Sequence, residues 1–243
     1  MKPNDECQGR GIFLTRDPNV IKPTDQVVIQ KYMYKPHLIE GLKYDLRIYV
    51  MLCGVNPLRV YIYKDGLARF ATVKYEKPKD DNIDNLFMHL TNYAINKESE
   101  GFVANTDKNN DDVGSKRSLQ RILEGIELDD GEEAMENVQM KLYDIINKSL
   151  CMSTPHMTHL IRSCHPDDIE NQLCFQILGF DVIIDSNLRP FLLEINQCPS
   201  LKTDSPIDIR IKRGLVIDVM KKLCLTVARK TQYKMERKAR LEA

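Results

Sequence analysis

Residues 175–196 read FQILGFDVIIDSNLRPFLLEIN, and this stretch decides the fold class. Two largely apolar runs, Phe175–Ile184 and Arg189–Ile195, lie on either side of the polar segment Asp185–Leu188. Runs of β-branched and aromatic residues around a short polar segment are typical of an antiparallel β hairpin. The stretch therefore predicts two paired strands of an apolar sheet.

The hairpin gathers polar side chains on one face. A two-residue turn at Ser186-Asn187 places Asp181 opposite Leu192. Glu194 and Asn196 then share this face, with Asp181 and Glu194 as diagonal neighbours about 7–8 Å apart. Two carboxylates among apolar neighbours are costly unless a positive charge lies between them. Two acids and an amide suit Mg²⁺ carrying phosphate, and pairing of both acids with Lys or Arg elsewhere in the sheet is the alternative.

The rest of the chain predicts further strands and two helices. Alternation over Leu46–Leu52 predicts a half-buried strand, and Asp-Gly within Lys64–Leu67 predicts the turn of another hairpin. Apolar residues at helical spacing predict helices over Val138–Leu150 and Leu215–Leu223. Strands mixed with helices indicate an α/β (α+β) fold, with mixed or antiparallel sheets and flanking helices.

The composition is that of a globular chain with no overall charge. Its 243 residues include 35 basic and 35 acidic side chains, which argues against a surface built for nucleic acid. No uncharged run is long enough to span a bilayer, no secretory signal begins the chain, and the seven cysteines show no C-x-x-C spacing. We therefore expect a cytoplasmic protein with no nucleic-acid or membrane partner.

Two further groups of residues favour an anionic ligand. The glycines of Gly9-Arg10-Gly11, with Lys2 nearby, let the backbone approach phosphate oxygens, and a plain hairpin turn explains them as well. Charged and polar groups also lie within apolar segments, namely Lys43, Asp45, Arg47, Arg69 and His89–Tyr93. Each alone is more often a structural group. Together with the two acids they predict a site for a metal-bound nucleotide.

Longer motifs follow one another along the chain: Lys2-Pro3, Gln8–Gly11, Lys43–Arg47, Gly66–Ala71, His89–Tyr93, Gly114–Lys116, Leu178–Asp181, Leu193–Asn196 and Pro199–Leu201. In this order they resemble the tubulin–tyrosine ligase-like family, and within it the polyglutamylase branch, over nearly the whole chain. The resemblance implies a catalytic domain of the ATP-grasp fold, with ATP and Mg²⁺ as cofactors.

The resemblance also implies roles for individual residues. The nucleotide would contact Lys2, Gln8, Gly9, Arg10, Gly11, Gln30, Lys31, Tyr32, Met33, Lys43, Asp45, Thr91 and Asn92. The incoming glutamate would contact Arg69, Tyr93 and Lys116, and Mg²⁺ would be held by Asp181, Glu194 and Asn196. Arg10 would also face the acceptor chain, so the catalytic set would be Arg10, Asp181 and Glu194.

The implied reaction is carboxylate activation. ATP would phosphorylate a glutamate carboxylate on a tubulin C-terminal tail, and the amino group of free L-glutamate would displace phosphate from the acylphosphate. The expected enzyme is a monomer that acts on microtubules of the cytoplasm, and the family also suggests cilia and basal bodies. Cys7-Gln8 resembles members that elongate glutamate chains, whereas Ala94 and Gln197 stand where relatives often have serine and histidine.

The two ends of the chain carry further expectations. Relatives have about a domain's length before the Lys-Pro motif, whereas Met1 directly precedes Lys2, so residues 1–225 are expected to be a catalytic domain lacking its N-terminal portion. Residues 226–243 are expected to form a basic helical tail that steers the enzyme onto acidic microtubules, a solvated helix end being the alternative. The open alternatives for function are an inactive, truncated microtubule-binding module and a related ligase that adds glycine or tyrosine to tubulin.

Overall fold

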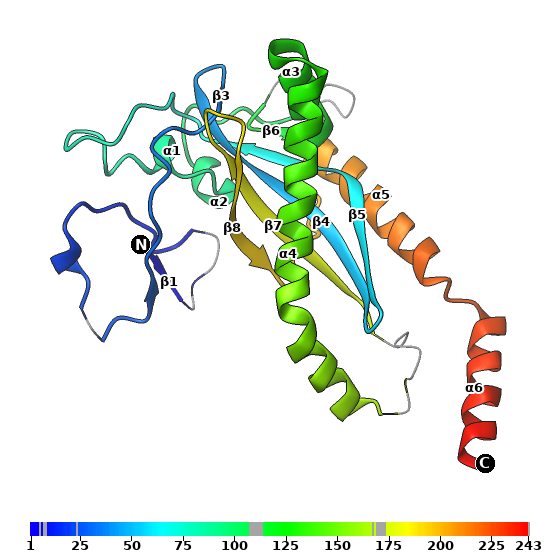
Figure 1. The fold of residues 1–243 in the computed structure, drawn as a ribbon. Coiled ribbons are helices and arrows are strands. Elements are labelled where there is room, and N and C mark those ends of the chain that lie inside the picture. The colour runs from blue at the N-terminus through cyan, green and yellow to red at the C-terminus, as the bar shows by residue number, and fades with distance from the viewer. Residues whose placement is uncertain are drawn as a thin grey trace.

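The computed structural model of this chain describes residues 1–242 except 5, 7, 8, 23, 107–113, 167 and 169–173. Its main body is an antiparallel six-stranded sheet with helices on both faces (Figure 1). The strand order is β6-β5-β4-β7-β8, and β3 pairs with the start of β4. These strands are β3 (Leu38–Ile39), β4 (Leu42–Val55), β5 (Leu58–Phe70), β6 (Lys116–Ser118), β7 (Gln176–Ile184) and β8 (Pro190–Asn196). The predicted class, a mixed α/β fold with an antiparallel sheet and flanking helices, is confirmed.

Strand β4 lies at the centre of the sheet, because β5 pairs with one of its edges and β7 with the other. Successive side chains of a strand point to opposite faces. Leu46 and Ile48 pack into the core on one face, and Tyr49 and Met51 pack into the core on the other. The strand predicted at Leu46–Leu52 is confirmed, but it is buried on both faces rather than half-buried.

Helices α3 (Leu119–Asp130) and α4 (Glu132–Cys164) cover the first face. Ser118 caps α3, since its hydroxyl accepts the Arg121 backbone N–H at 3.2 Å. The helix predicted over Val138–Leu150 is confirmed as part of α4, which packs its buried side chains Val138, Leu142, Ile146 and Leu150 onto the sheet. Helix α3 was not predicted, although it contributes the buried residues Leu119, Ile122, Leu123 and Ile126.

Helix α5 (Pro206–Leu223) covers part of the second face and confirms the helix predicted at Leu215–Leu223. It packs against Tyr49, Met51 and Leu67 through its own Ile207, Ile211, Leu215 and Val219. Helix α6 (Val227–Glu242) follows it and extends away from the sheet, as Figure 1 shows. None of the described side chains of α6 is buried. Within the described ranges, no helix combines the length and apolar character needed to cross a membrane.

The turn predicted at Lys64–Leu67 is wrong. Strand β5 continues through these residues, although its pairing with β4 shifts between Ile62 and Gly66, and the chain reverses at Val55–Leu58 instead. Gly66 does not adopt a positive φ here. A Cβ atom at Gly66 would lie 2.5 Å from the Arg47 carbonyl oxygen. The glycine therefore permits the close approach of two strands rather than a turn.

The hairpin predicted over 175–196 is confirmed as β7 and β8, but its register differs from the prediction. The reversal is longer than two residues, and the pairing shifts between Asp181 and Val182. Asp181 therefore lies directly opposite Glu194 rather than diagonal to it. Leu192 lies opposite Val182, and both pack against the core beneath α3 and α4.

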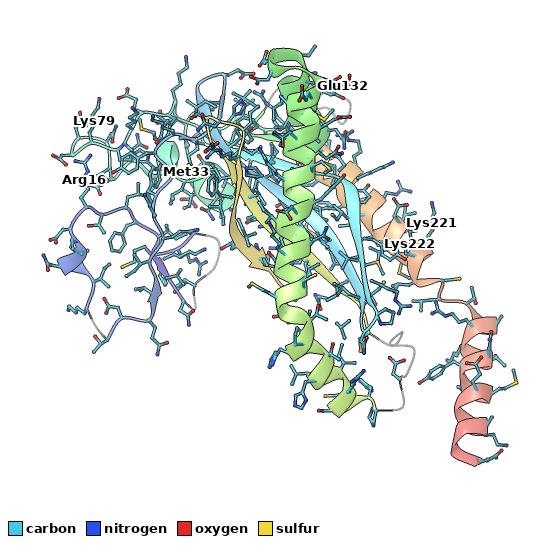
Figure 2. All side chains as sticks on the ribbon, viewed as in Figure 1. Arg16, Met33, Lys79, Glu132, Lys221 and Lys222 are labelled. Carbon is cyan, nitrogen blue, oxygen red and sulfur yellow. The ribbon has the colours of Figure 1, made fainter. Side chains whose placement is uncertain are left out.

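The N-terminal segment lies beside the sheet rather than in it. Outside the main body are β1 (Lys2–Pro3), the 3-10 helix η1 (Pro18–Val20), β2 (Val27–Val28), α1 (Leu86–His89) and α2 (Tyr93–Asn96). Figure 2 shows Arg16 next to the loop that carries Lys79, and Arg16 pairs with Asp80 at 2.8 Å. This contact joins the N-terminal segment to the loop before α1.

Candidate active site

A cavity of about 460 Å³ lies between the N-terminal segment and the sheet. Its walls come from the first residues of the chain, residues 28–34 and the loop 78–92, and its floor comes from β4, β5, β7 and β8. Nine of the residues predicted to contact the nucleotide line this cavity: Lys2, Gln30, Lys31, Tyr32, Met33, Lys43, Asp45, Thr91 and Asn92. The fold thus brings residues that are far apart in the sequence to one cavity.

The glycine motif lies next to this cavity rather than in its lining. Gly9, Arg10 and Gly11 are not among the lining residues, and Gln8 lies outside the described residues. Gly9 has a φ of 86°, and a Cβ atom there would lie 3.0 Å from the side chain of Asn92. Since Asn92 lines the cavity, a side chain at position 9 would press on the cavity wall.

Lys43 has a buried ammonium group with a fixed position. Its Nζ donates to the His89 carbonyl oxygen at 2.7 Å and to the Tyr32 hydroxyl at 3.1 Å. The same group lies 4.3 Å from the centroid of the Tyr32 ring. Burial lowers the pKa of Lys43 to about 8, against the opposing charge of Asp45. A phosphate group bound beside Lys43 would therefore raise its pKa and stabilise its charged form.

Four charged side chains form a buried network on the cavity floor, which we call the charge network: Asp45, Arg47, Arg69 and Asp181. Strand register builds it, because Asp45 pairs with Arg69 and Arg47 with Asp181 across the sheet. Arg47 forks onto both carboxylate oxygens of Asp181, with Nη2 at 2.8 Å, and Arg69 bonds to Asp181 at 2.7 Å and to Asp45 at 2.9 Å. For Asp181 this is the pairing with basic residues that the sequence left open as an alternative, whereas Glu194 pairs with Lys2 of the N-terminal segment at 3.0 Å.

The pKa values of the two acids of the charge network shift in opposite directions. Burial raises the pKa of Asp45, even though Arg69 opposes this change. Burial also acts to raise the pKa of Asp181, but the two arginines outweigh it and hold the pKa of this carboxyl below its ordinary value. Asp181 is thus the acid of the pair that stays ionised most readily, as a metal ligand must be.

Gly179 leaves the space that Arg47 occupies. A Cβ atom at Gly179 would lie 3.0 Å from Cδ of Arg47 and 2.9 Å from Cβ of Pro199. Both contacts are tighter than ordinary van der Waals distances. The absence of a side chain therefore lets the stem of Arg47 cross β7 toward Asp181.

The three predicted metal ligands lie together. The Asn196 amide donates to Glu194 at 3.2 Å and to Asp181 at 3.4 Å, and the Lys2 ammonium donates to Glu194 at 3.0 Å. No three His, Cys, Asp or Glu side chains gather at a metal-binding distance in the part of the chain that the structure describes. Two carboxylates and an amide oxygen nevertheless fit Mg²⁺, which usually takes one or two protein carboxylates and completes its shell with water and phosphate.

The residues predicted for the incoming glutamate fall into two places. Arg69 lines the cavity, but both of its acid partners already engage it. Tyr93 and Lys116 are not among the lining residues. They contact each other, with the Lys116 Nζ 3.6 Å from the Tyr93 ring centroid, and Lys116 is the cross-strand partner of Arg69. Lys116 therefore lies one strand beyond the cavity floor.

Residues 1–233 match the family described as Tubulin-tyrosine ligase family. The chain belongs to this family. Its fold is accordingly the ATP-grasp-like fold of the tubulin-tyrosine ligase family, as the sequence predicted.

Relatives within the tubulin-tyrosine ligase family have related names. The chain is 45% identical over 238 residues to the Probable beta-tubulin polyglutamylase of Tetrahymena thermophila, with 98% of this chain and 20% of that protein covered. It is 43% identical over 219 residues to human Tubulin polyglutamylase TTLL6, covering 90% of this chain and 24% of the relative. It is 42% identical over 243 residues to human Tubulin polyglutamylase TTLL13, covering 99% and 29%. The chain thus spans less than a third of the length of these relatives.

Sequence reasoning missed one residue of this arrangement, Asp208, and it gave no individual role to Arg47 and His89, which it had placed among the groups of the nucleotide site. Arg47 was noted as a charged residue in an apolar strand, and its alternation with Lys43 and Asp45 could have placed it on their face. His89 lines the cavity and bonds to the Tyr32 hydroxyl at 3.0 Å. Asp208 is fully buried beside Lys116. No motif of the sequence pointed to Asp208.

Proposed function

We propose that this chain carries the catalytic site of an ATP- and Mg²⁺-dependent tubulin polyglutamylase, which ligates free L-glutamate to glutamates of tubulin C-terminal tails. The observation that carries the proposal is the convergence of Lys2, Lys43, Asp181 and Glu194 on one cavity. A set of cations facing two carboxylates suits a metal-bound polyphosphate. The names of the relatives support tubulin as the acceptor.

Each group has a place in the proposed site. The ammonium groups of Lys2 and Lys43 would bind phosphate oxygens, and residues 30–33 would contact the base. Asp181, Glu194 and Asn196 would hold Mg²⁺, which supplies charge neutralisation at the phosphates. Arg47 and Arg69 fix the carboxylate of Asp181, so its orientation is set before the metal arrives.

The proposed reaction has two steps. An acceptor glutamate carboxylate takes the γ-phosphoryl group of ATP, which leaves ADP and an acylphosphate. The amine of free glutamate then attacks the carbonyl carbon, so that an amide forms, phosphate leaves and the amine gives up a proton. The protein contributes positioning and charge neutralisation, which dominate phosphoryl transfer generally.

Finer aspects of the proposal rest on the resemblance. Arg69, Tyr93 and Lys116 would bind the incoming glutamate, and Arg10 would face the acceptor chain. Cys7-Gln8 supports chain elongation rather than initiation, and both residues lie outside the described part of the chain. The enzyme would act as a monomer on microtubules of the cytoplasm, including those of cilia and basal bodies.

The test is ATP-dependent incorporation of labelled amino acids into purified microtubules. We expect this chain to incorporate glutamate in preference to glycine or tyrosine, and Glu194→Gln to abolish incorporation because it removes a carboxylate from the metal site. Glu40→Gln is the matched control, since Glu40 pairs with Arg117 and does not line the cavity.

Other outcomes would replace the proposal. Preference for glycine or tyrosine would make the chain a different ligase of the same family. Absence of incorporation together with retained microtubule binding would make it an inactive binding module. Equal activity of wild type and Glu194→Gln would remove Glu194 from the metal site.

A further inference from the structure

Asp208 is a buried acid for which the proposed reaction has no role so far. It is 0% exposed and lies in the first turn of α5. Its Oδ2 pairs with the Lys116 Nζ at 2.6 Å, and its Oδ1 pairs with the Lys212 Nζ at 2.8 Å. The Ser205 hydroxyl donates to Oδ2 at 2.7 Å. One carboxylate thus joins two lysines of different elements, β6 and α5.

Ser205 uses its hydroxyl for this carboxylate rather than for the helix. As the N-cap residue of α5 it would ordinarily accept a backbone N–H of the first turn, but it makes no such side-chain bond. The local arrangement therefore favours orientation of Asp208 over capping of α5.

The carboxylate of Asp208 fixes the ammonium of Lys116 against the face of Tyr93. The Lys116 Nζ lies 3.6 Å from the Tyr93 ring centroid, and the lysine is 5% exposed. Lys116, Lys212 and Asp208 together carry one net positive charge. A buried group with one excess positive charge and an aromatic wall is suited to a single carboxylate.

We infer that Asp208 is a positioning residue for the amino-acid substrate, holding Lys116 beside Tyr93 so that this cation meets a carboxylate of the incoming glutamate. The inference rests on the proposed function, because Lys116 is assigned to glutamate there. Asp208 itself does not touch the substrate, and it acts through Lys116.

The charges around Lys116 give a pH signature of this role. Lys116 faces Asp208 and Lys212 from α5, Asp204 from the segment before α5, Tyr93 from α2 and Arg69 from β5. Burial lowers the pKa of Lys116, while Asp208 acts to raise it. Removal of the Asp208 charge should therefore let Lys116 lose its proton at lower pH.

The experiment measures KM for glutamate and KM for ATP across pH in the full chain. We expect Asp208→Asn to raise KM for glutamate about tenfold, to leave KM for ATP unchanged, and to move the alkaline rise of KM for glutamate to lower pH. A merely structural role would change both KM values together or neither.

A second variant covers the case in which Asp208→Asn does not fold. The double variant Asp208→Asn with Lys212→Met keeps one positive charge in the buried group, as in the wild type. It lacks the carboxylate that orients Lys116, so we expect KM for glutamate to stay raised. Glu40→Gln is the matched control, because it removes an acid paired with Arg117, the neighbour of Lys116 in β6.

The outcomes separate this inference from the proposed function. Unchanged KM for glutamate in an active Asp208→Asn variant, or wild-type KM in the double variant, would overturn the inference alone. Absence of glutamate incorporation by the wild type would overturn the proposed function and this inference with it.

Discussion

The two faces of β4 bury different kinds of side chains. On the face beneath α3 and α4, Leu46 and Ile48 enter a continuous apolar core. On the opposite face, Lys43, Asp45 and Arg47 precede Tyr49 in strict alternation, so the charged part of the strand passes directly into the core beneath α5. We call these the apolar face and the mixed face.

The difference between the faces lies in what each side chain needs from its neighbours. An apolar residue needs only close packing, which many neighbours can supply. A buried charge needs a specific partner at hydrogen-bonding distance, because an unpaired charge is far more costly than a small void. Removal of one charged group from the mixed face should therefore lower the free energy of unfolding more than a substitution on the apolar face. Removal of its partner as well should restore more of that free energy.

The largest effect is expected from Asp181→Asn on the mixed face. This change leaves Arg47 and Arg69 without the charge that they share, so we expect about 4 kcal/mol of destabilisation, measured by urea unfolding. The double variant Arg47→Met with Asp181→Leu removes the pair together and should cost less than half as much. A double variant as unstable as the single one would contradict the partner argument.

Leu46→Ala tests the apolar face and should have the next largest effect. Leu46 is 0% exposed, and its truncation leaves a cavity that costs about 3 kcal/mol. The effect should appear in urea unfolding, whereas KM for ATP of the folded protein should be unchanged. A change in KM for ATP without a loss of stability would show that the two faces are not independent.

A smaller effect is expected from pH at Lys43, on the charged part of the mixed face. Burial lowers the pKa of Lys43 to about 8, so the side chain is charged below that pH and loses its proton above it. Phosphate favours the charged form, and ATP affinity should therefore fall about tenfold per pH unit above this point.

The measurement is titration with a fluorescent ATP analogue from roughly pH 7 to roughly pH 9.5. Lys43→Arg keeps its charge over this range and should give a flat profile. A wild-type profile as flat as that of the arginine variant would show that Lys43 does not bind phosphate.

The smallest effect on the folded body is expected from α6, because none of the α6 side chains that the structure describes is buried. Charge reversal of its six basic residues, Arg229, Lys230, Lys234, Arg237, Lys238 and Arg240, should lower unfolding stability by about 1 kcal/mol at most, because Arg229 loses its hydrogen bond to the Leu223 carbonyl oxygen. It should weaken microtubule co-sedimentation at low salt and have less effect at high salt. Unchanged co-sedimentation at low salt would leave α6 as a solvated helix.

The spacing of apolar residues predicted the buried helices and strands well, because buried positions recur at the period of the helix or strand. The helix at Val138–Leu150 and the strand at Leu46–Leu52 are examples. Local turn chemistry was less reliable. Asp-Gly at position 66 suggested a turn, but the close approach of β4 explains the glycine, and that approach depends on distant residues.

The site shows the same division between local and distant signals. Lys43 and Asp181 were predicted from their polar character in apolar strands, and both line the cavity. The register predicted for the hairpin at Asp181 was wrong, because the alternation of apolar and polar residues does not reveal a single shift in strand pairing. Asp208 lies in a helix without a motif, and only tertiary structure brings it to Lys116.

The charge network also has a consequence for the order in which the chain is synthesised. Arg47 and Arg69 lie in adjacent strands that can pair as soon as both have left the ribosome. Asp181 follows Arg47 by 134 residues. A newly made β4–β5 pair therefore presents an open strand edge with an arginine that has no Asp181 to bind, until β7 is translated. The charge network can therefore be completed only after β7 has been made.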